Sequence, residues 1–304
     1  MRNVLLMLAL GLLLLQPDAA RAADPPDSLA LMLPAIPRTL RRPPQRAAWL
    51  LAHFWDAMDF SDPARARDRD FLERNLVDYL SLFPHADPAS RAPAAADLLQ
   101  RAEADPVSWR LLAELLEKYL FEPESPVFSE ETYLLFLEQI ADSALLGGGE
   151  RRRRGFQREM LRKNRPGTEA ADFPYTARDG RSLSLHGSGN GGPMLLILYD
   201  AGCAHCLEVM AELGEDVQLA QAVGAGRLEV LAVCLDADRE TLLGSSAGLP
   251  AGWMTGFETG TIYEDGLYML RSLPALLLLD GGKRVLLRHP TPAELREYIA
   301  SELR

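Results

Sequence analysis

The chain has 304 residues, more than one small hydrophobic core usually occupies, so we expect two domains. A composition of 48% hydrophobic and 25% charged residues is ordinary for a folded globular protein and excludes wholesale disorder or a fibrous repeat. The net charge of −11 argues against nucleic acid or an anionic membrane surface as the main partner. Three cysteines are too few for a disulfide-stapled mini-scaffold or a four-cysteine zinc ribbon.

The first residues have the three parts of a cleavable secretory signal. Arg2 gives a short basic start, Val4–Leu15 is apolar, and Ala20-Arg21-Ala22 is a small-residue cleavage motif. A membrane anchor is the alternative, but a helix that crosses a bilayer needs about 20 apolar residues. No later run of residues is apolar for that length. The sequence therefore predicts a signal peptide at 1–22 and an exported protein, which suits the bacterial periplasm, where disulfides can form.

The next part of the mature chain is expected to be helical. Residues 23–43 are rich in alanine, proline and arginine and are expected to form a flexible leader. From 44 to 166 the apolar residues recur with the period of a helix, which predicts an all-α domain of five or six helices. This domain is a candidate module for binding a partner. Asp105-Pro106 and Ser129 are typical of helix starts, and Gly147-Gly148-Gly149 of a helix end.

The last helix of this region, expected at 150–164, is strongly basic. It contains Arg151–Arg154, Arg158 and Arg162. A solvated face that docks on an acidic surface is favoured over an anion-binding site.

From 167 to 304 the pattern becomes that of an α/β domain. Asp179-Gly180 predicts a hairpin turn between two short strands. Met194–Tyr199 is continuously apolar, as in a buried strand, and a helix is expected at Cys203–Leu213 before a second apolar strand at Leu228–Leu235. Strand, helix and strand in this order predict a central sheet flanked by helices.

The rest of this domain is expected to finish the same sheet. Residues 238–270 have the pattern of mixed helix and loop. Ala275–Leu279 and Arg284–Arg288 flank two glycines and are expected to form a hairpin. Thr291-Pro292-Ala293-Glu294 predicts the start of a last helix, with threonine as the N-cap.

Two cysteines lie where the strand Met194–Tyr199 turns into a helix. Cys203 and Cys206 are three residues apart at the helix start, which brings both sulfurs within disulfide reach. The unpaired N–H groups and the positive end of the helix dipole point at Cys203 and favour its thiolate. His205 adds a donor or a positive charge beside that thiolate, which shifts the redox couple toward the oxidising side.

A structural disulfide and half of a zinc site are the alternatives. A zinc site needs four ligands, and the other candidates, Cys234, His186 and His289, have no paired spacing. A disulfide that closes so short a loop removes little entropy from the unfolded chain. A redox-active dithiol is therefore the favoured interpretation. Cys234, inside an apolar strand, is expected to be a buried and inert thiol.

Downstream of the dithiol, Leu273-Pro274 precedes the apolar strand that starts at Ala275. With this feature, residues 167–304 resemble the thioredoxin-like fold, in particular the TlpA/ResA-like thiol–disulfide oxidoreductases of the bacterial envelope. Gly167–Phe173 resembles their opening G-x-x-A-P-D-F signature, with Ala171 in place of the usual proline. Cys203–Cys206 matches their active-site C-x-x-C. Leu273-Pro274 matches the cis-proline loop that faces the dithiol, which implies a cis bond at Pro274 and substrate-binding roles for Leu273 and Pro274.

The helical region resembles an uncharacterised domain that often precedes thioredoxin-like modules in bacterial envelope proteins. The matching pieces are Trp55-Asp56, Asp59-Phe60, Lys118–Leu120 and the junction Lys163–Thr168.

Two residues depart from the family pattern beside the dithiol. Gly202 stands where a tryptophan is common. Ile197 stands where thioredoxins have a buried acid that assists proton transfer at the second cysteine. That role would then fall to water, to His205 or to another nearby group such as Asp200, for which a role in the turn alone is an equal alternative.

These features together imply an exported thiol–disulfide oxidoreductase that exchanges disulfides with protein thiols in the envelope. Cys203 would attack a substrate disulfide, and Cys206 would resolve the mixed disulfide. No metal and no cofactor other than the reversible Cys203–Cys206 disulfide are expected, and an oxidant or reductant of unknown identity would reload it. The alternative is a non-enzymatic envelope binding or scaffold protein whose dithiol is structural or vestigial.

Overall fold

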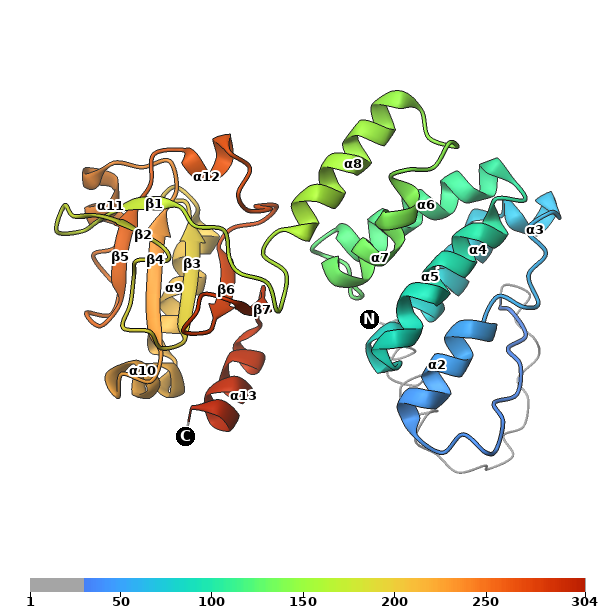
Figure 1. Cartoon of the computed structure of the whole chain (residues 1–304), viewed down its shortest axis with the longest axis horizontal. Helices are drawn as coiled ribbons and strands as arrows, with labels where there is room; N and C mark the ends of the chain where they lie inside the picture. Colours follow the sequence, from blue (N-terminus) through green and yellow to red (C-terminus); the bar gives the residue numbers. More distant parts are fainter. Residues whose placement is uncertain (1–29, 304) are drawn as a thin grey trace. The chain divides into compact units, whose positions relative to one another are not determined.

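A computed structural model describes residues 30–303, and the expected signal peptide and the first residues of the expected leader lie outside this range. The chain divides into two compact units, the first ending at Arg158 and the second beginning at Glu159 (Figure 1). The first unit is helical and the second is built on a seven-stranded sheet, so the predicted fold class is confirmed. Within residues 30–303, no helix is both long and apolar enough to cross a membrane.

The first unit is a series of helices with short connections. Their bounds are α2 (Pro43–His53), α3 (Pro63–Ala66), α4 (Arg69–Leu80), the 3-10 helix η1 (Phe83–His85), α5 (Pro88–Ala102), α6 (Pro106–Phe121), α7 (Glu130–Ile140) and α8 (Gly148–Arg162). Helix α5 packs against α2 and α7, and α6 packs against α4 and α7. Both predicted helix starts are confirmed, because Asp105 accepts the N–H of Val107 and Ser129 accepts the N–H of Thr132.

The end of α7 differs from the prediction. This helix stops at Ile140. Gly148 and Gly149 open α8, and Gly147 directly precedes it, so the glycines do not end a helix. The turn after α7 carries Leu146 into the core, where it is buried. Helix α7 therefore ends before the buried turn that contains Leu146, several residues upstream of the glycines.

One residue of the expected leader is fixed to helix α4. Leu31 is buried, and its N–H donates to the side-chain oxygen of Asn75 at 2.9 Å. Asn75 is itself buried and donates to the carbonyl of Phe71 at 2.7 Å. This hydrogen-bonded pair holds the chain around Leu31 against the helical core.

The basic helix α8 contributes a buried arginine to the first unit. The side chain of Arg154 lies 2.9 Å from the carboxylate of Glu117, and its guanidinium also donates to the hydroxyl of Tyr133. Gln157 donates to the same carboxylate at 2.7 Å. The prediction of a solvated face is therefore wrong at Arg154, because its charge is compensated inside the helical core.

We expect Arg154→Ala to lower the free energy of unfolding by about 3–5 kcal/mol, because it removes the buried partner of Glu117. Urea denaturation followed by circular dichroism measures this change. Arg152→Ala, at an exposed position of the same helix, is the matched control. A loss no larger than that of the control would contradict the importance of the buried ion pair.

The second unit contains one mixed sheet. Its strands are β1 (Pro174–Ala177), β2 (Ser182–Ser184), β3 (Met194–Tyr199), β4 (Glu229–Cys234), β5 (Met254–Phe257), β6 (Ala275–Leu279) and β7 (Val285–Arg288), in the order β2-β1-β5-β4-β3-β6-β7. Strands β3, β4 and β5 are parallel, whereas β6 runs antiparallel to β3. The predicted hairpins are β1–β2 and β6–β7.

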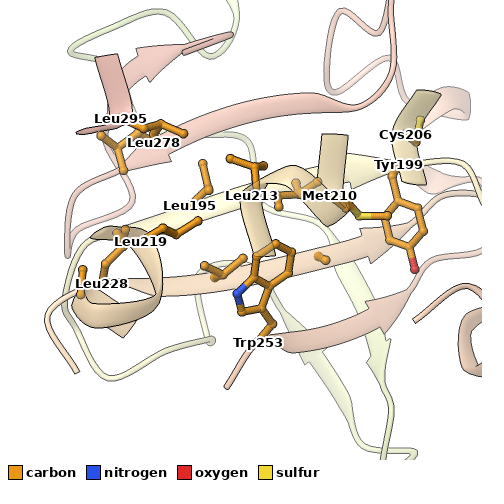
Figure 2. Packing of buried hydrophobic residues seen from close by; sticks show 14 of the residues in the cluster. Leu195, Tyr199, Cys206, Met210, Leu213, Leu219, Leu228, Trp253, Leu278 and Leu295 are labelled. Atoms are coloured by element: carbon orange, nitrogen blue, oxygen red, sulfur yellow. The ribbon is translucent and has the colours of Figure 1, made fainter. Parts of the chain in front are cut away.

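Both faces of this sheet are covered. The helices are α9 (Ala204–Glu215), α10 (Val217–Gly224), α11 (Arg239–Ser245), α12 (Thr261–Glu264) and α13 (Pro292–Glu302). Helices α9, α10, α11 and α13 pack on the face that carries Leu195, Ile197 and Tyr199 (Figure 2). The other face packs against α12 and the segment around Phe173. Strand β3 is thus buried on both sides, which explains its continuous apolar run.

Strand β5 lies in the region 238–270, where only helix and loop are expected. A Cβ atom at Gly256 would lie 2.4 Å from the ring of Tyr175 and 2.9 Å from the carbonyl oxygen of Thr176. Glycine is therefore required where β5 meets β1. Because glycine has no side chain and is uncommon inside strands, residues 254–257 do not have the sequence pattern of a strand.

Candidate active site

The dithiol lies where β3 ends and α9 begins. Cys203 is the N-cap of α9, and its sulfur accepts the N–H of Cys206 at 3.2 Å. Cys203 is half-buried, whereas Cys206 is completely buried, and both are free thiols. The site thus pairs one partly accessible cysteine with one that is buried.

The predicted proline loop faces this pair. The Leu273–Pro274 peptide bond is cis, as the family resemblance implies. The carbonyl oxygen of Leu273 lies 4.0 Å from the sulfur of Cys203. Both residues of the loop are half-buried, so part of each is accessible to a bound molecule.

Asp200 closes the turn that precedes the dithiol. Its side-chain oxygen accepts the N–H of Gly202 at 2.6 Å, and its backbone carbonyl accepts the N–H of Cys203 at 3.2 Å. The residue remains exposed despite these bonds. His205 is also exposed, on the first turn of α9. Asp200 therefore stabilises the turn, which is one of the two roles that the sequence left open, and the residue is exposed to solvent.

The second sulfur has an apolar environment. Cys206 belongs to the buried cluster that contains Ile197, Met210 and Tyr199, and it lies beside Tyr199 at one end of that cluster (Figure 2). Burial raises the pKa of the Cys206 thiol, and its interaction with Cys203 raises it further. Cys206 is therefore protonated at neutral pH until a base removes its proton.

Cys234 is fully buried, as expected from its place in an apolar strand. It lies opposite Tyr199 in the register of β3 and β4. Burial raises the pKa of this thiol as well.

Comparison with known proteins identifies the family to which the chain belongs. Residues 16–164 match a family described as a domain of unknown function, DUF5106. A thioredoxin-like protein from Bacteroides caccae, solved as a crystal structure, is 32% identical with a TM-score of 0.83, and the match covers 89% of this chain and 98% of that one. The chain belongs to the thioredoxin-like proteins. A conserved protein of unknown function from Bacteroides fragilis is 31% identical over 44% of this chain and 98% of its own, with a TM-score of 0.41. No curated protein matches.

Two exposed residues of this thioredoxin-like protein, one on α9 and one on α12, were not singled out from the sequence. Leu207 follows Cys203 by one turn of α9 and is 38% exposed. Tyr263 of α12 is 51% exposed, and its pKa is raised by partial burial and then by the charges of nearby groups, including Asp200 and Cys206. The helical spacing from Cys203 could have revealed Leu207, whereas the position of Tyr263 depends on the tertiary fold.

The described residues, 30–303, contain no group of three or more histidine, cysteine, aspartate or glutamate side chains suited to hold a metal ion. Three further residues were considered as zinc ligands from the sequence. These residues, His186, His289 and Cys234, do not form a group with the dithiol that could hold a metal ion.

We expect iodoacetamide at neutral pH to modify Cys203 first. Burial hides the Cys206 and Cys234 sulfurs and raises the pKa of both thiols, so each should react at least about tenfold more slowly, the effect of one pKa unit on the thiolate fraction. Mass spectrometry of quenched time points measures the order. Equal labelling of Cys203 and Cys206 in the folded protein would contradict the unequal burial of the two sulfurs.

Proposed function

We propose that this thioredoxin-like protein is a thiol–disulfide oxidoreductase that exchanges disulfides with protein substrates. The observation that carries the proposal is the unequal pair at the start of α9. The half-buried sulfur of Cys203 caps the helix, and the buried sulfur of Cys206 lies one turn behind it. Helix N–H groups directed at a sulfur favour its thiolate, which is the nucleophile of disulfide exchange.

The reaction proceeds in two exchanges. The thiolate of Cys203 attacks one sulfur of a substrate disulfide, and the other substrate sulfur leaves as a thiolate. Cys206 then attacks Cys203, which releases the reduced substrate and leaves a Cys203–Cys206 disulfide. In the reverse direction this disulfide passes to a substrate dithiol. The Cys203–Cys206 dithiol gives up two electrons when it forms the disulfide and takes them up in the reverse direction, so the exchange needs no other cofactor.

The loop at Leu273-Pro274 is the proposed contact for the substrate backbone. It lies beside Cys203, with the Leu273 carbonyl 4.0 Å from the sulfur, and its backbone leads directly into β6. An extended substrate segment would pair with this backbone in the manner of an added strand. His205, exposed on the adjacent turn, would stabilise the thiolate of Cys203 and with it the reduced form, which makes the disulfide a stronger oxidant.

The proposed location is the periplasm. The basic, apolar and small-residue segments at 1–22 support export, and an oxidising compartment permits the disulfide form of the dithiol. Protein thiols and disulfides of the envelope would then be the substrates. The helical unit would serve as the module that binds a partner.

We expect Cys203→Ser to abolish the reduction of insulin disulfides, because it removes the nucleophile. Cys206→Ser should accumulate mixed disulfides with substrate, because it removes the resolving thiol. Turbidity and non-reducing electrophoresis measure the two effects. Cys234→Ala, at a buried position on β4, is the control that changes a cysteine outside the pair. Undiminished turnover by Cys203→Ser would sink the proposal.

The reduction potential of the pair separates this function from that of a scaffold with a structural disulfide. A working couple should equilibrate with glutathione at a potential above about −300 mV, whereas a structural bridge lies below that value. A value below this limit would favour the non-enzymatic alternative.

A further inference from the structure

A cavity of about 470 Å³ lies in the helical unit, far along the sequence from the dithiol. Its wall comes from the end of α5, the first turn of α6 and the end of α7, three helices that pack against one another (Figure 1). The volume falls within the range of small-molecule sites, about 300–1,000 Å³. A cavity of this size in the helical unit is a candidate binding site separate from the dithiol.

The wall of the cavity is acidic. Three of its residues are carboxylates, Glu103, Glu138 and Asp142, and none is a lysine, an arginine or a histidine. Asp142 has a cation of its own, since Arg158 lies 2.6 Å from its carboxylate. Glu103 is exposed and forms no ion pair with any residue in the range 30–303. The cavity therefore keeps negative charge that can attract a cation from outside.

Two helix ends add to this negative potential. The carboxyl end of a helix carries partial negative charge, which favours cations and disfavours carboxylates. Glu103 nevertheless follows α5 directly, and Glu138 lies in the last turn of α7, which contains no basic residue. The positive end of α6 is already capped by the carboxylate of Asp105. Acidic residues at two helix carboxyl ends oppose helix stability, so folding alone does not account for them.

The arginines that neighbour the cavity residues in sequence are bound elsewhere. Arg101 of α5 donates to Asp97 at 2.6 Å and to Asp56 at 3.0 Å. Arg110 of α6 donates to the carbonyl of Leu145 at 3.0 Å. Neither arginine belongs to the wall of the cavity. These two basic side chains therefore do not occupy it.

Trp109 adds a hydrogen-bond donor to the acidic wall. The residue lines the cavity although it is only 1% exposed. No group in the described part of the chain accepts its indole N–H. Buried donors in proteins are nearly always hydrogen-bonded, so this N–H indicates an acceptor on a bound molecule. The acceptor has to be neutral, because the carboxylates of the wall repel an anion.

A metal ion does not match these features. Between residues 30 and 303, no three carboxylate, histidine or cysteine side chains are grouped to hold one. The matching ligand is an extended organic cation with a neutral acceptor beside it. A basic residue of a polypeptide has both, because its cationic head is carried on an apolar stem next to a peptide carbonyl.

We propose that this cavity binds an arginine or lysine side chain of a partner polypeptide. The cationic head forms a charge-assisted hydrogen bond with Glu103, and a peptide carbonyl accepts the indole N–H of Trp109. The apolar stem packs against Leu99, which also lines the cavity. The proposal assigns a ligand chemistry to the helical unit and does not depend on disulfide exchange at the dithiol.

Titration of the full chain with a short blocked peptide that contains one arginine tests the site. The four tryptophans of the chain give four indole N–H signals in a proton–nitrogen correlation spectrum. Replacing each tryptophan by phenylalanine in a separate variant assigns these signals, by elimination where one variant misfolds. We expect the Trp109 signal to move in a saturable manner at millimolar peptide. The same peptide with uncharged citrulline in place of arginine should leave the signal where it is.

Glu103→Gln tests the charge of the cavity. The variant should bind the arginine peptide at least about tenfold more weakly, because it loses a hydrogen bond between two charged groups. Glu124→Gln removes an equal charge at an exposed position outside the cavity, so it is the matched control and should bind as the native protein does. Equal binding by Glu103→Gln and the control would overturn the proposal.

Free arginine and a polyamine test the source of the cation. Each should bind more weakly than the blocked peptide, because neither offers a peptide carbonyl next to a single basic head. Binding of either one as tightly as the peptide would overturn the assignment to a polypeptide. A Trp109 signal that stays in place with every probe would overturn the site itself. The titration does not involve the dithiol, so a failure of the exchange function leaves its result unaffected.

Discussion

The sulfur of Cys203 caps helix α9, and this contact links the chemistry of the site to the fold. The first N–H groups of a helix have no partner inside the helix, and Cys203 accepts one of them from Cys206 at 3.2 Å. Because a cap is the last residue before the helix, the end of β3 fixes where the reactive sulfur lies. Both the donated N–H and the helix dipole favour negative charge on that sulfur. The same turn directs Cys206 inward, so the two sulfurs differ in burial and therefore in ease of ionisation.

The register of β3 with β6 then brings the proline loop to the dithiol. The two strands are antiparallel, with Leu198 opposite Ala275. The carboxyl end of β3, which leads to Cys203, therefore lies beside the amino end of β6, which follows Pro274. Strand pairing in the buried centre of the sheet thus positions two loops that are far apart in the sequence. Strand β6 packs on both faces of the sheet, with Leu278 in one buried cluster and Leu277 in the other, so this pairing lies inside the core.

Local chemistry explains which parts could be predicted from the sequence. Helix starts such as Asp105, the buried strand β3 and the cysteine spacing depend on neighbouring residues, and each was predictable. Strand β5 was not, because Gly256 is there to admit Tyr175 from a distant strand. Arg154 was expected on a solvated face because a run of arginines resembles one, and its partner Glu117 is on another helix. Strand β5 and Arg154 both depend on contacts between segments far apart in the chain.

The apolar residue at position 197 has a consequence for packing. A carboxylate at position 197 would have to be desolvated between β4 and β6, which costs folding free energy unless it is compensated. Ile197 fills this space with a well-packed side chain, and the carboxylate at Asp200 remains in solvent with one oxygen bound by Gly202.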